Sequence, residues 1–200
     1  MRSKFDQQLA ALNQELTEMG ATCAQAIGLA AQALEQQDVA LAAPVGQLEE
    51  QTNEQERTIE ALCLKLLLQQ QPVARDLRQI SAALKMITDM ERIGDQAADI
   101  AEIIPFFLSL NTFDCTLVCR MAQQASSMVT QSVDAFVRRD VYLARSVAGQ
   151  DDLVDEDFTA VKQALIAAIA REPGQGEVAL DLQMIAKYFE RVGDRAVILS

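Results

Sequence analysis

The chain has 200 residues, of which half are hydrophobic, only 4% are aromatic and none is Trp. This composition is typical of helical bundles rather than β-sandwiches. The formal net charge of −12 argues against nucleic-acid binding through the overall field, and it favours cations or a basic face on a protein partner. The complete absence of His excludes Ser-His-Asp and Cys-His catalysis, His-ligated zinc and His-containing di-iron sites.

Six helices are predicted, in chain order, from hydrophobic spacing and from the four prolines. A heptad seam from Phe5 to Ala33, with alternating steps of four and three residues, predicts a first helix over about 4–37. Pro44 suits the first turn of a second helix that runs to about 69. The remaining helices are expected over about 74–104 (after Pro72 and stopped near Pro105), 114–138 (capped by 111–114), 141–171 and 176–200. Short connections favour antiparallel neighbours and an all-α fold of two tandem three-helix bundles.

The cysteines and the hydropathy pattern predict a soluble, intracellular protein with reduced thiols. The four cysteines, which have no Cys-x-x-Cys spacing, are Cys23, Cys63, Cys115 and Cys119. Core packing is their expected role, although the last two, four residues apart, could approach a soft metal. No secretory signal opens the sequence, and its most apolar run, 103–110, is far shorter than the ~20 residues that cross a bilayer.

One phrase occurs twice in the sequence. Glu-Arg-Ile-Gly-Asp occupies 91–95, and Glu-Arg-Val-Gly-Asp occupies 190–194. Further stretches align at an offset of 102 residues: 33–42 with 135–144, and Glu49, Glu50 and Asn53 with Asp151, Asp152 and Asp155. A shorter connection near 173 reduces the offset to 99, a change that loops absorb at small cost. The pattern predicts two copies of one unit, about 1–105 and 110–200.

Each copy places several acidic residues on one helix face. Glu91, Asp95, Asp99 and Glu102 fall within an arc of about 80° at 100° per residue. Neighbouring carboxylates on one face repel by a few tenths of a kcal/mol, so their repetition indicates a bound hard cation, with a solvated helix end as the alternative. Oxygen ligands favour Mg, Ca, Mn or Fe over Zn. The candidate metal ligands are Glu49, Asn53, Glu91, Asp95 and Asp99 in the first copy, and Asp151, Asp155, Glu190 and Asp194 in the second.

The other residues of the repeated phrase allow two interpretations each. Arg92 and Arg191 could screen the acids or bind a phosphate, or they are ordinary helix-surface residues. Gly94 and Gly193 each cost about 1 kcal/mol in a helix interior relative to Ala. They indicate close helix approach or access for an ion, with a tolerated glycine as the alternative.

The chain resembles the PhoU family of phosphate-uptake regulators over essentially its whole length. The resemblance rests on Met19-Gly20, on Ala33-Leu34 with Asp38 and Leu41-Ala42, on Gln70-Gln71-Pro72-Val73-Ala74-Arg75-Asp76-Leu77-Arg78, and on the duplicated phrase. It implies two similar three-helix bundles with metal clusters on the acidic motifs, and Fe, Mn, Zn and Mg are the candidate ions. It also implies a non-enzymatic, cytoplasmic, membrane-peripheral adaptor, often a homodimer. Such an adaptor links a phosphate ABC transporter, through its ATPase subunit, to a sensor histidine kinase, and it damps the phosphate-starvation response.

Two positions depart from the family pattern. Ile198 stands where the family usually has Asn, so a weaker second acidic face is expected. The family's last helix normally runs beyond the position of Ser200, so a short member or a trimmed chain is expected. Two other functions fit the acids: a metal-dependent phosphohydrolase, which the absence of His disfavours, and a plain metal-binding helical scaffold.

Overall fold

The structure, a computed structural model, describes residues 2–70, 73–110 and 113–200. The described residues form α-helices and two short 3-10 turns. The helices are α1 (Arg2–Gln36), α2 (Val45–Gln70), α3 (Ala74–Leu110), α4 (Thr116–Arg138), α5 (Val141–Arg171) and α6 (Gly176–Leu199), and the 3-10 turns are η1 (Val39–Leu41) and η2 (Pro173–Gln175). The prediction of six helices in an all-α fold is confirmed.

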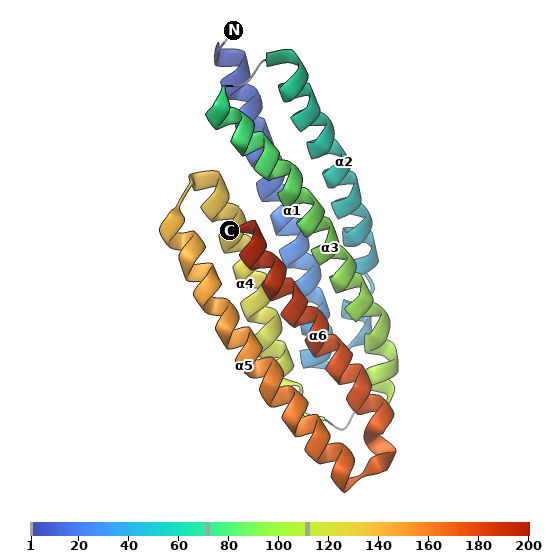
Figure 1. Cartoon of the computed structure of the whole chain (residues 1–200). Helices are drawn as coiled ribbons and strands as arrows, with labels where there is room; N and C mark the ends of the chain where they lie inside the picture. Colours follow the sequence, from blue (N-terminus) through green and yellow to red (C-terminus); the bar gives the residue numbers. More distant parts are fainter. Residues whose placement is uncertain (1, 71–72, 111–112) are drawn as a thin grey trace.

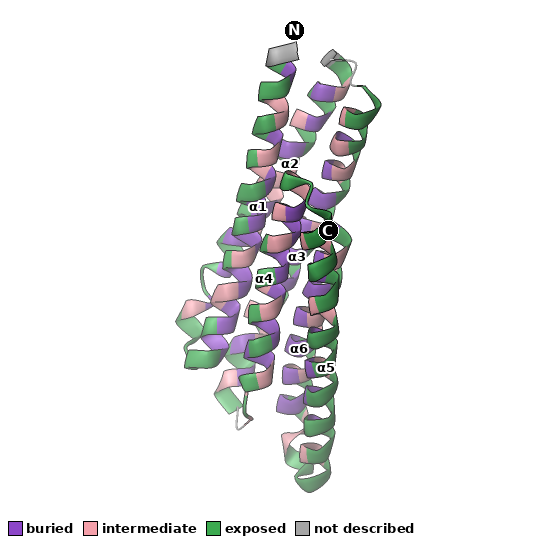
Figure 2. Ribbon diagram, turned by 90° about the vertical axis from the view of Figure 1, so that its left-hand side faces the viewer, coloured by how far each residue is buried: buried purple, intermediate pink, exposed green. Residues whose placement is uncertain are grey.

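The helices form two antiparallel bundles, α1–α2–α3 and α4–α5–α6, which lie side by side in one elongated molecule (Figure 1). The bundles join through α1 against α4 and α3 against α6. Within the described residues, α2 and α5 pack only on elements of their own bundle, so they lie on the outside. Figure 2 shows the result, with exposed residues along the outer helix surfaces and buried residues turned inward.

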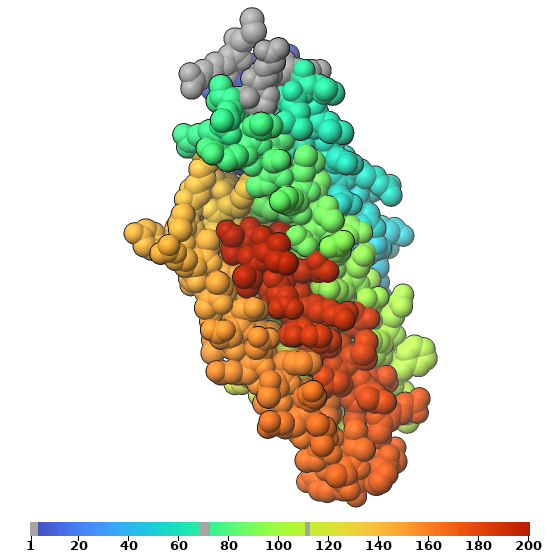
Figure 3. Space-filling model, viewed as in Figure 1, coloured from blue at the N-terminus to red at the C-terminus, as the bar shows by residue number. Residues whose placement is uncertain are grey.

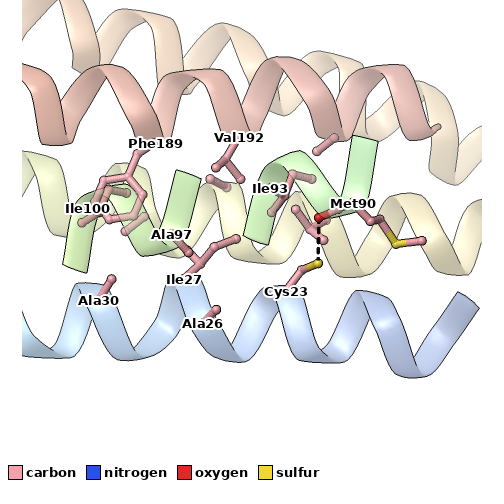
Figure 4. Close-up of a cluster of buried hydrophobic side chains, with 14 of the residues drawn as sticks. Cys23, Ala26, Ile27, Ala30, Met90, Ile93, Ala97, Ile100, Phe189 and Val192 are labelled. Carbon is pink, nitrogen blue, oxygen red and sulfur yellow. Dashed lines mark hydrogen bonds between the residues drawn. The ribbon is translucent and has the colours of Figure 1, made fainter. Parts of the chain in front are cut away.

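The heptad seam of α1 supplies the first bundle's core, as the spacing predicts. Except for the partly buried Leu9, its members from Phe5 to Ala33 are buried. The core continues across the junction, where Cys23 and Ile27 of α1 lie with Met90 of α3 and Val192 of α6 (Figure 4). Each fully buried aliphatic side chain contributes roughly 1.5–3 kcal/mol of transfer free energy. The two bundles therefore share one core.

Equivalent connections end the first helix of each bundle. Gln37 and Arg139, 102 residues apart, both adopt positive φ, at 53° and 56°. Asp38 and Asp140 follow them and accept hydrogen bonds from backbone N–H groups at the start of the next helical segment. These paired turns are the structural form of the repeated segments 33–42 and 135–144.

The prediction that α3 stops near Pro105 is wrong, because the helix continues to Leu110. A proline inside a helix lacks one N–H donor and costs about 3 kcal/mol. Here Ile104 and Phe107, on either side of it, are fully buried, and their packing holds the last turn in place. The expected roles of Pro72, Asn111 and Thr112 lie outside the described residues. Asp114 does bind the start of α4, because its Oδ1 accepts a 2.9 Å hydrogen bond from the Thr116 N–H.

Three of the cysteines lie in the core, as expected for packing residues. Cys23, Cys63 and Cys119 are buried, and burial raises the pKa of each thiol to about 12, 11 and 12 respectively. Thiols with raised pKa values are poor nucleophiles and poor metal ligands. In the part of the chain that the structure describes, no helix is both long and apolar enough to cross a membrane.

Candidate functional site

The first acidic face lies between the antiparallel helices α2 and α3. Its members are Glu49, Asn53 and Glu56 of α2, with Glu91, Asp95 and Asp99 of α3. Partial burial, the carboxylates of Asp95 and Glu56, and more weakly that of Glu49, raise the pKa of Glu91. The structure therefore brings acids of both helices together, as the sequence predicts. Asn53 donates a hydrogen bond to Glu49, which holds the α2 side of the face in place.

Gly94 allows α2 and α3 to approach closely beneath this face. A Cβ atom at Gly94 would lie 3.3 Å from both Cβ and Cγ2 of Thr52, which is fully buried. The Thr52 hydroxyl donates a 2.9 Å hydrogen bond to the Leu48 carbonyl, so this neighbour is fixed. Of the interpretations offered for Gly94, close helix approach has a direct structural basis.

Two members of the first face, Asp95 and Asp99, lie near side chains of α6. Burial, followed by the charge of Asp99 and a hydrogen bond with Asp99, raises the pKa of Tyr188 on α6. Burial and the charge of Asp99 raise the pKa of Asp95, and the guanidinium groups of Arg195 and Arg92 oppose that rise. Arg195 also donates a 2.8 Å ion-pair hydrogen bond to Asp89. The first face is thus continuous with the α3–α6 junction.

The second acidic face lies between α5 and α6. Asp151 is its central residue: burial, followed by the charges of Asp155, Asp194 and Glu190, raises the pKa of Asp151 to about 6. Its Oδ1 atom is buried and, among the described residues, has no hydrogen-bond partner. A Cβ atom at Gly193 would lie 2.8 Å from that oxygen, so the glycine makes room for the carboxylate. The predicted acids of this copy therefore also converge.

Two residues that sequence reasoning missed distinguish the second face. Lys187 Nζ lies 2.5 Å from both carboxylate oxygens of Glu190 and 5.1 Å from the ring centroid of Phe158. Ile198 is 67% exposed at the place equivalent to Asp99, as expected for a weaker face. The repeat alignment contained this signal, because Lys187 and Phe158 stand opposite Thr88 and Glu56.

The repeated arginines lie on the surface beside the two faces. Arg92 is exposed, and its charge lowers the pKa values of Glu91 and Asp95 against the dominant effect of burial. The guanidinium of Arg191 lies 6.0 Å from the Tyr188 ring centroid. The screening interpretation of Arg92 therefore has a basis in the structure.

The acids match a hard cation in chemistry but do not form a closed site. Over residues 2–70, 73–110 and 113–200, no group of three or more Cys, Asp and Glu side chains gathers closely enough to hold a metal ion. Both faces offer the oxygen donors that Mg²⁺, Mn²⁺ and similar ions prefer. The first face carries no lysine ion pair among its described residues, whereas Lys187 already neutralises part of the second. The first face is the better fit to a cation.

Comparison with known proteins places this arrangement in a family. The model of the PhoU domain matches residues 16–104 and 118–200. A phosphate-specific transport system accessory protein PhoU homolog from Clostridium acetobutylicum is 32% identical over 196 residues, which cover 97% of this chain and 90% of that protein. A homolog of the same description from Pseudomonas aeruginosa is 31% identical, over 96% of this chain and 81% of its own length.

Solved structures give the same answer for the fold. The crystal structure of PhoU from Pseudomonas aeruginosa superposes with a TM-score of 0.92 at 30% identity, covering 98% of this chain and 94% of that one. The phosphate transport system regulatory protein PhoU from Streptococcus pneumoniae superposes with a TM-score of 0.80 at 25% identity, covering 98% and 96%. Two domain matches, relatives that align over nearly all of this chain and a shared helical fold lead to one conclusion: the chain belongs to the PhoU family.

Proposed function

We propose that this protein is a non-enzymatic, cytoplasmic regulator of phosphate uptake and of phosphate-starvation signalling. It acts as an adaptor between the ATPase subunit of a phosphate ABC transporter and a sensor histidine kinase, and it keeps the starvation response low when phosphate is plentiful. Family membership over both repeats supports this proposal, as do the accessory and regulatory descriptions of its relatives. The homodimer expected from the resemblance is tested by light scattering of the purified chain.

The observation that carries the proposal is the first acidic face. Glu49, Glu56 and Glu91 lie together at the surface between α2 and α3, where burial first and neighbouring carboxylates second raise the pKa values of Glu91 and Asp95. A surface of this kind gains free energy when a cation or a basic protein face neutralises it. It is therefore suited to docking, either directly or through a bound metal ion.

We propose the acidic faces as the metal-binding surfaces, with the first face favoured. Glu49, Asn53, Glu91, Asp95 and Asp99 would supply the oxygen ligands there, and Asp151, Asp155, Glu190 and Asp194 would do so on the second face. The ion would be Fe, Mn, Zn or Mg, and it would neutralise the carboxylates and offer open coordination positions to an acidic group of a partner. Arg92 and Arg191 flank the two sites and would adjust their charge.

A binding experiment with the two proposed partners tests the regulatory function. The purified chain is presented to the transporter's ATPase subunit and to the cytoplasmic part of the kinase, with and without Mn²⁺ and phosphate. The double variant Glu91→Ala/Asp95→Ala is expected to weaken binding at least tenfold. Glu50→Ala/Glu54→Ala is the matched control, because both acids are exposed and also lie four residues apart on α2. If the unchanged protein binds neither partner under any of these conditions, the proposed regulatory function is wrong.

Elemental analysis tests whether the acidic faces bind a metal ion. Protein is purified without chelators or metal-affinity resin, and its Fe, Mn, Zn and Mg contents are measured for wild type, for both double variants and for Glu190→Ala/Asp194→Ala. Stoichiometric metal that is lost from Glu91→Ala/Asp95→Ala but retained in Glu50→Ala/Glu54→Ala supports the first face as the site. A metal-free wild type contradicts metal binding and leaves the acids as a direct docking surface. Turnover of any phosphoester by the metal-loaded protein would contradict the non-enzymatic assignment.

A further inference from the structure

An exposed apolar patch lies where the end of α3 meets the start of α6, away from the labelled N and C ends in Figure 1. Phe106 is 73% exposed and Leu180 is 63% exposed. Figure 3 shows the lime-green end of α3 and the orange-red start of α6 adjoining at the lower right of the molecule. We call this surface the α3–α6 patch, and its members are Ile103, Phe106 and Leu110 of α3 with Leu180 and Met184 of α6.

Helix register brings the members of the patch together. Tyr188 of α6 forms a hydrogen bond with Asp99 of α3, which fixes the relative position of the two helices. Because α3 and α6 run antiparallel, the α3 residues after Asp99 lie beside the α6 residues before Tyr188. Phe106 follows Asp99 by seven residues, and Met184 and Leu180 precede Tyr188 by four and eight. These spacings are whole helical turns, so the three side chains lie on the same outer side of the helix pair.

The second copy of the unit shows that the fold does not require apolar residues at these places on α6. At the offset of 99 residues, Leu180 and Met184 are equivalent to Ser81 and Lys85, which are exposed and polar. On α3, the patch exists because the helix continues past Pro105. Buried side chains hold these last turns, and their outer side presents apolar groups to solvent. A cluster of large apolar side chains that stays exposed without a structural need marks an interaction surface.

The charge around the patch has one sign. Residues 93–110 of α3 and 172–186 of α6 contain six acidic residues and no basic residue. Glu102, Glu177 and Asp181 lie within four residues of patch members, and we call these three the acidic rim. Burial, followed by the charge of Glu177, raises the pKa of Asp181. The acidic rim therefore attracts a basic partner and repels the anionic surface of a membrane.

We propose that the α3–α6 patch binds an amphipathic helix of a protein partner, with apolar side chains on one face and Lys or Arg beside them. The backbones of α3 and α6 already satisfy their own hydrogen bonds, so an extended segment would find no backbone partner here. A helix pairs its own backbone groups, and its side chains repeat at the turn spacing of the patch. The test uses neither Glu91 nor Asp95, so the inference stands whether or not the proposed regulatory function holds.

Fluorescence anisotropy of the full chain with a labelled Leu/Lys amphipathic peptide of about 18 residues tests the patch, in about 0.15 M salt. We expect a dissociation constant below about 50 µM. The same peptide with Glu in place of Lys is expected not to bind. Phe106→Ser/Leu180→Ser is expected to weaken binding of the Leu/Lys peptide at least tenfold. The matched control is Leu68→Ser/Leu153→Ser, which removes two exposed leucines from α2 and α5 and should leave the affinity unchanged.

The acidic rim is tested separately from the overall negative charge. Glu102→Gln/Glu177→Gln is expected to weaken peptide binding about threefold. Glu50→Gln/Glu54→Gln removes the same charge from exposed positions on α2 and should have no effect. In methyl NMR spectra of the wild type, the Leu/Lys peptide is expected to shift the signal of Met184. Equal weakening by the two Gln variants, or an unmoved Met184 signal, would place the peptide elsewhere and contradict the proposal.

Other occupants of the patch would give different results. A wild type that is dimeric by light scattering, with a monomeric Phe106→Ser/Leu180→Ser variant, would make the patch an interface between two copies and overturn the proposal. Binding of phosphatidylcholine vesicles by wild type but not by this variant would also overturn it, in favour of a lipid surface. Circular dichroism checks the fold of each variant, and Phe106→Ser alone replaces a double variant that loses helicity. No peptide binding at about 0.5 mM, or equal weakening in the two Ser double variants, would contradict the proposal.

Discussion

The first acidic face lies between α2 and α3, the second lies between α5 and α6, and each is built around the same Glu-Arg-x-Gly-Asp phrase. Two of the equivalent helix positions at which they differ determine whether a lysine lies beside the acids. The first face has Glu56 and Thr88 there, and the Thr88 hydroxyl donates to Glu56 at 3.4 Å. The second has Phe158 and Lys187, and the ammonium group lies between the aromatic ring and Glu190. Among the described residues, a cation therefore forms an ion pair with an acid of the second face, whereas no acid of the first face has such an ion pair.

This difference shows how the two copies of a duplicated unit can serve different purposes, one contributing to stability and the other to binding. An internal lysine lowers the free energy of the folded state at all times, whereas an external cation does so only when it is present. The Glu190 side chain is 13% exposed, so its partner matters more than a surface ion pair would. We infer that the second repeat supports the fold and that the first repeat keeps its charge for a partner.

Lys187→Thr is expected to have the largest effect, because it gives the second face the arrangement of the first. It leaves the poorly exposed Glu190 beside Asp151 without its cation, and we expect a loss of about 1–3 kcal/mol in the free energy of unfolding at pH 7. Urea unfolding followed by circular dichroism measures the change. Lys162→Thr on the exposed side of α5 is the matched control for the lower helix propensity of Thr. Equal losses in the two variants would show that Lys187 has no special role.

Mild acid is expected to stabilise the protein through the second face. Burial and neighbouring carboxylates raise the pKa of Asp151 to about 6, well above its usual value of 3.8. The folded state therefore binds a proton more tightly than the unfolded state between these values, and its stability falls as pH rises through 6. After allowance for solvent screening, the gain between pH 7.5 and pH 5 is about 1 kcal/mol.

Asp151→Asn separates this contribution from the raised pKa values of Glu91 and Asp95 on the first face, which act in the same direction. The variant is expected to be more stable than wild type at pH 7.5 and to lose most of the pH response in urea unfolding. The exposed neighbour provides the control, because Asp152→Asn should keep the full response. A response that survives in Asp151→Asn would assign it to the other carboxyl groups with raised pKa values, which are Glu91 and Asp95 on the first face and Asp181 on α6.

The two repeated glycines are expected to respond unequally to alanine. At Gly94 the added Cβ meets the β-branched Thr52, which is buried and hydrogen-bonded, and we expect a net loss of about 1 kcal/mol despite the better helix propensity of Ala. At Gly193 it meets the tip of Asp151, which can rotate outward, and we expect a change within about 0.5 kcal/mol. Gly149→Ala, in open space on α5, serves as the reference for propensity alone. Thermal unfolding of the three variants would refute this order if Gly193→Ala were the least stable.

The fold could be predicted because its signals are local. The heptad seam of α1 and the capped turns after Gln37 and Arg139 depend on residues close in sequence, and the bounds predicted for α5, 141–171, agree with the structure. The end of α3 could not be predicted in this way, because the burial of Phe107 outweighs the cost of Pro105 and burial is a property of the whole fold.

The candidate sites show the same distinction between local signals in the sequence and contacts that only the fold creates. The acids that lie four residues apart could be placed on one face from helix periodicity alone, and the structure brings them together with acids of the neighbouring helix. The compensation by Lys187 was available in the repeat alignment but had meaning only once α5 and α6 were seen to place Phe158 beside it. By contrast, Gln79 of α3 and Arg139 at the end of α4 come from different repeats and form a hydrogen bond that no periodicity in the sequence predicts.

Thr88→Lys, the reverse exchange, is expected to have the smallest effect on stability and the clearest effect on cation binding. An exposed lysine three residues before Glu91 reproduces the spacing of Lys187 and Glu190, and it adds only a few tenths of a kcal/mol. It also supplies internally the positive charge that the first face would otherwise take from solution. If Mn²⁺ raises the melting temperature of wild type, we expect that rise to be lost in Thr88→Lys and kept in Thr17→Lys, which adds the same charge on exposed α1. An undiminished rise in Thr88→Lys would place the cation away from Glu56 and Glu91 and would remove the functional distinction between the two faces.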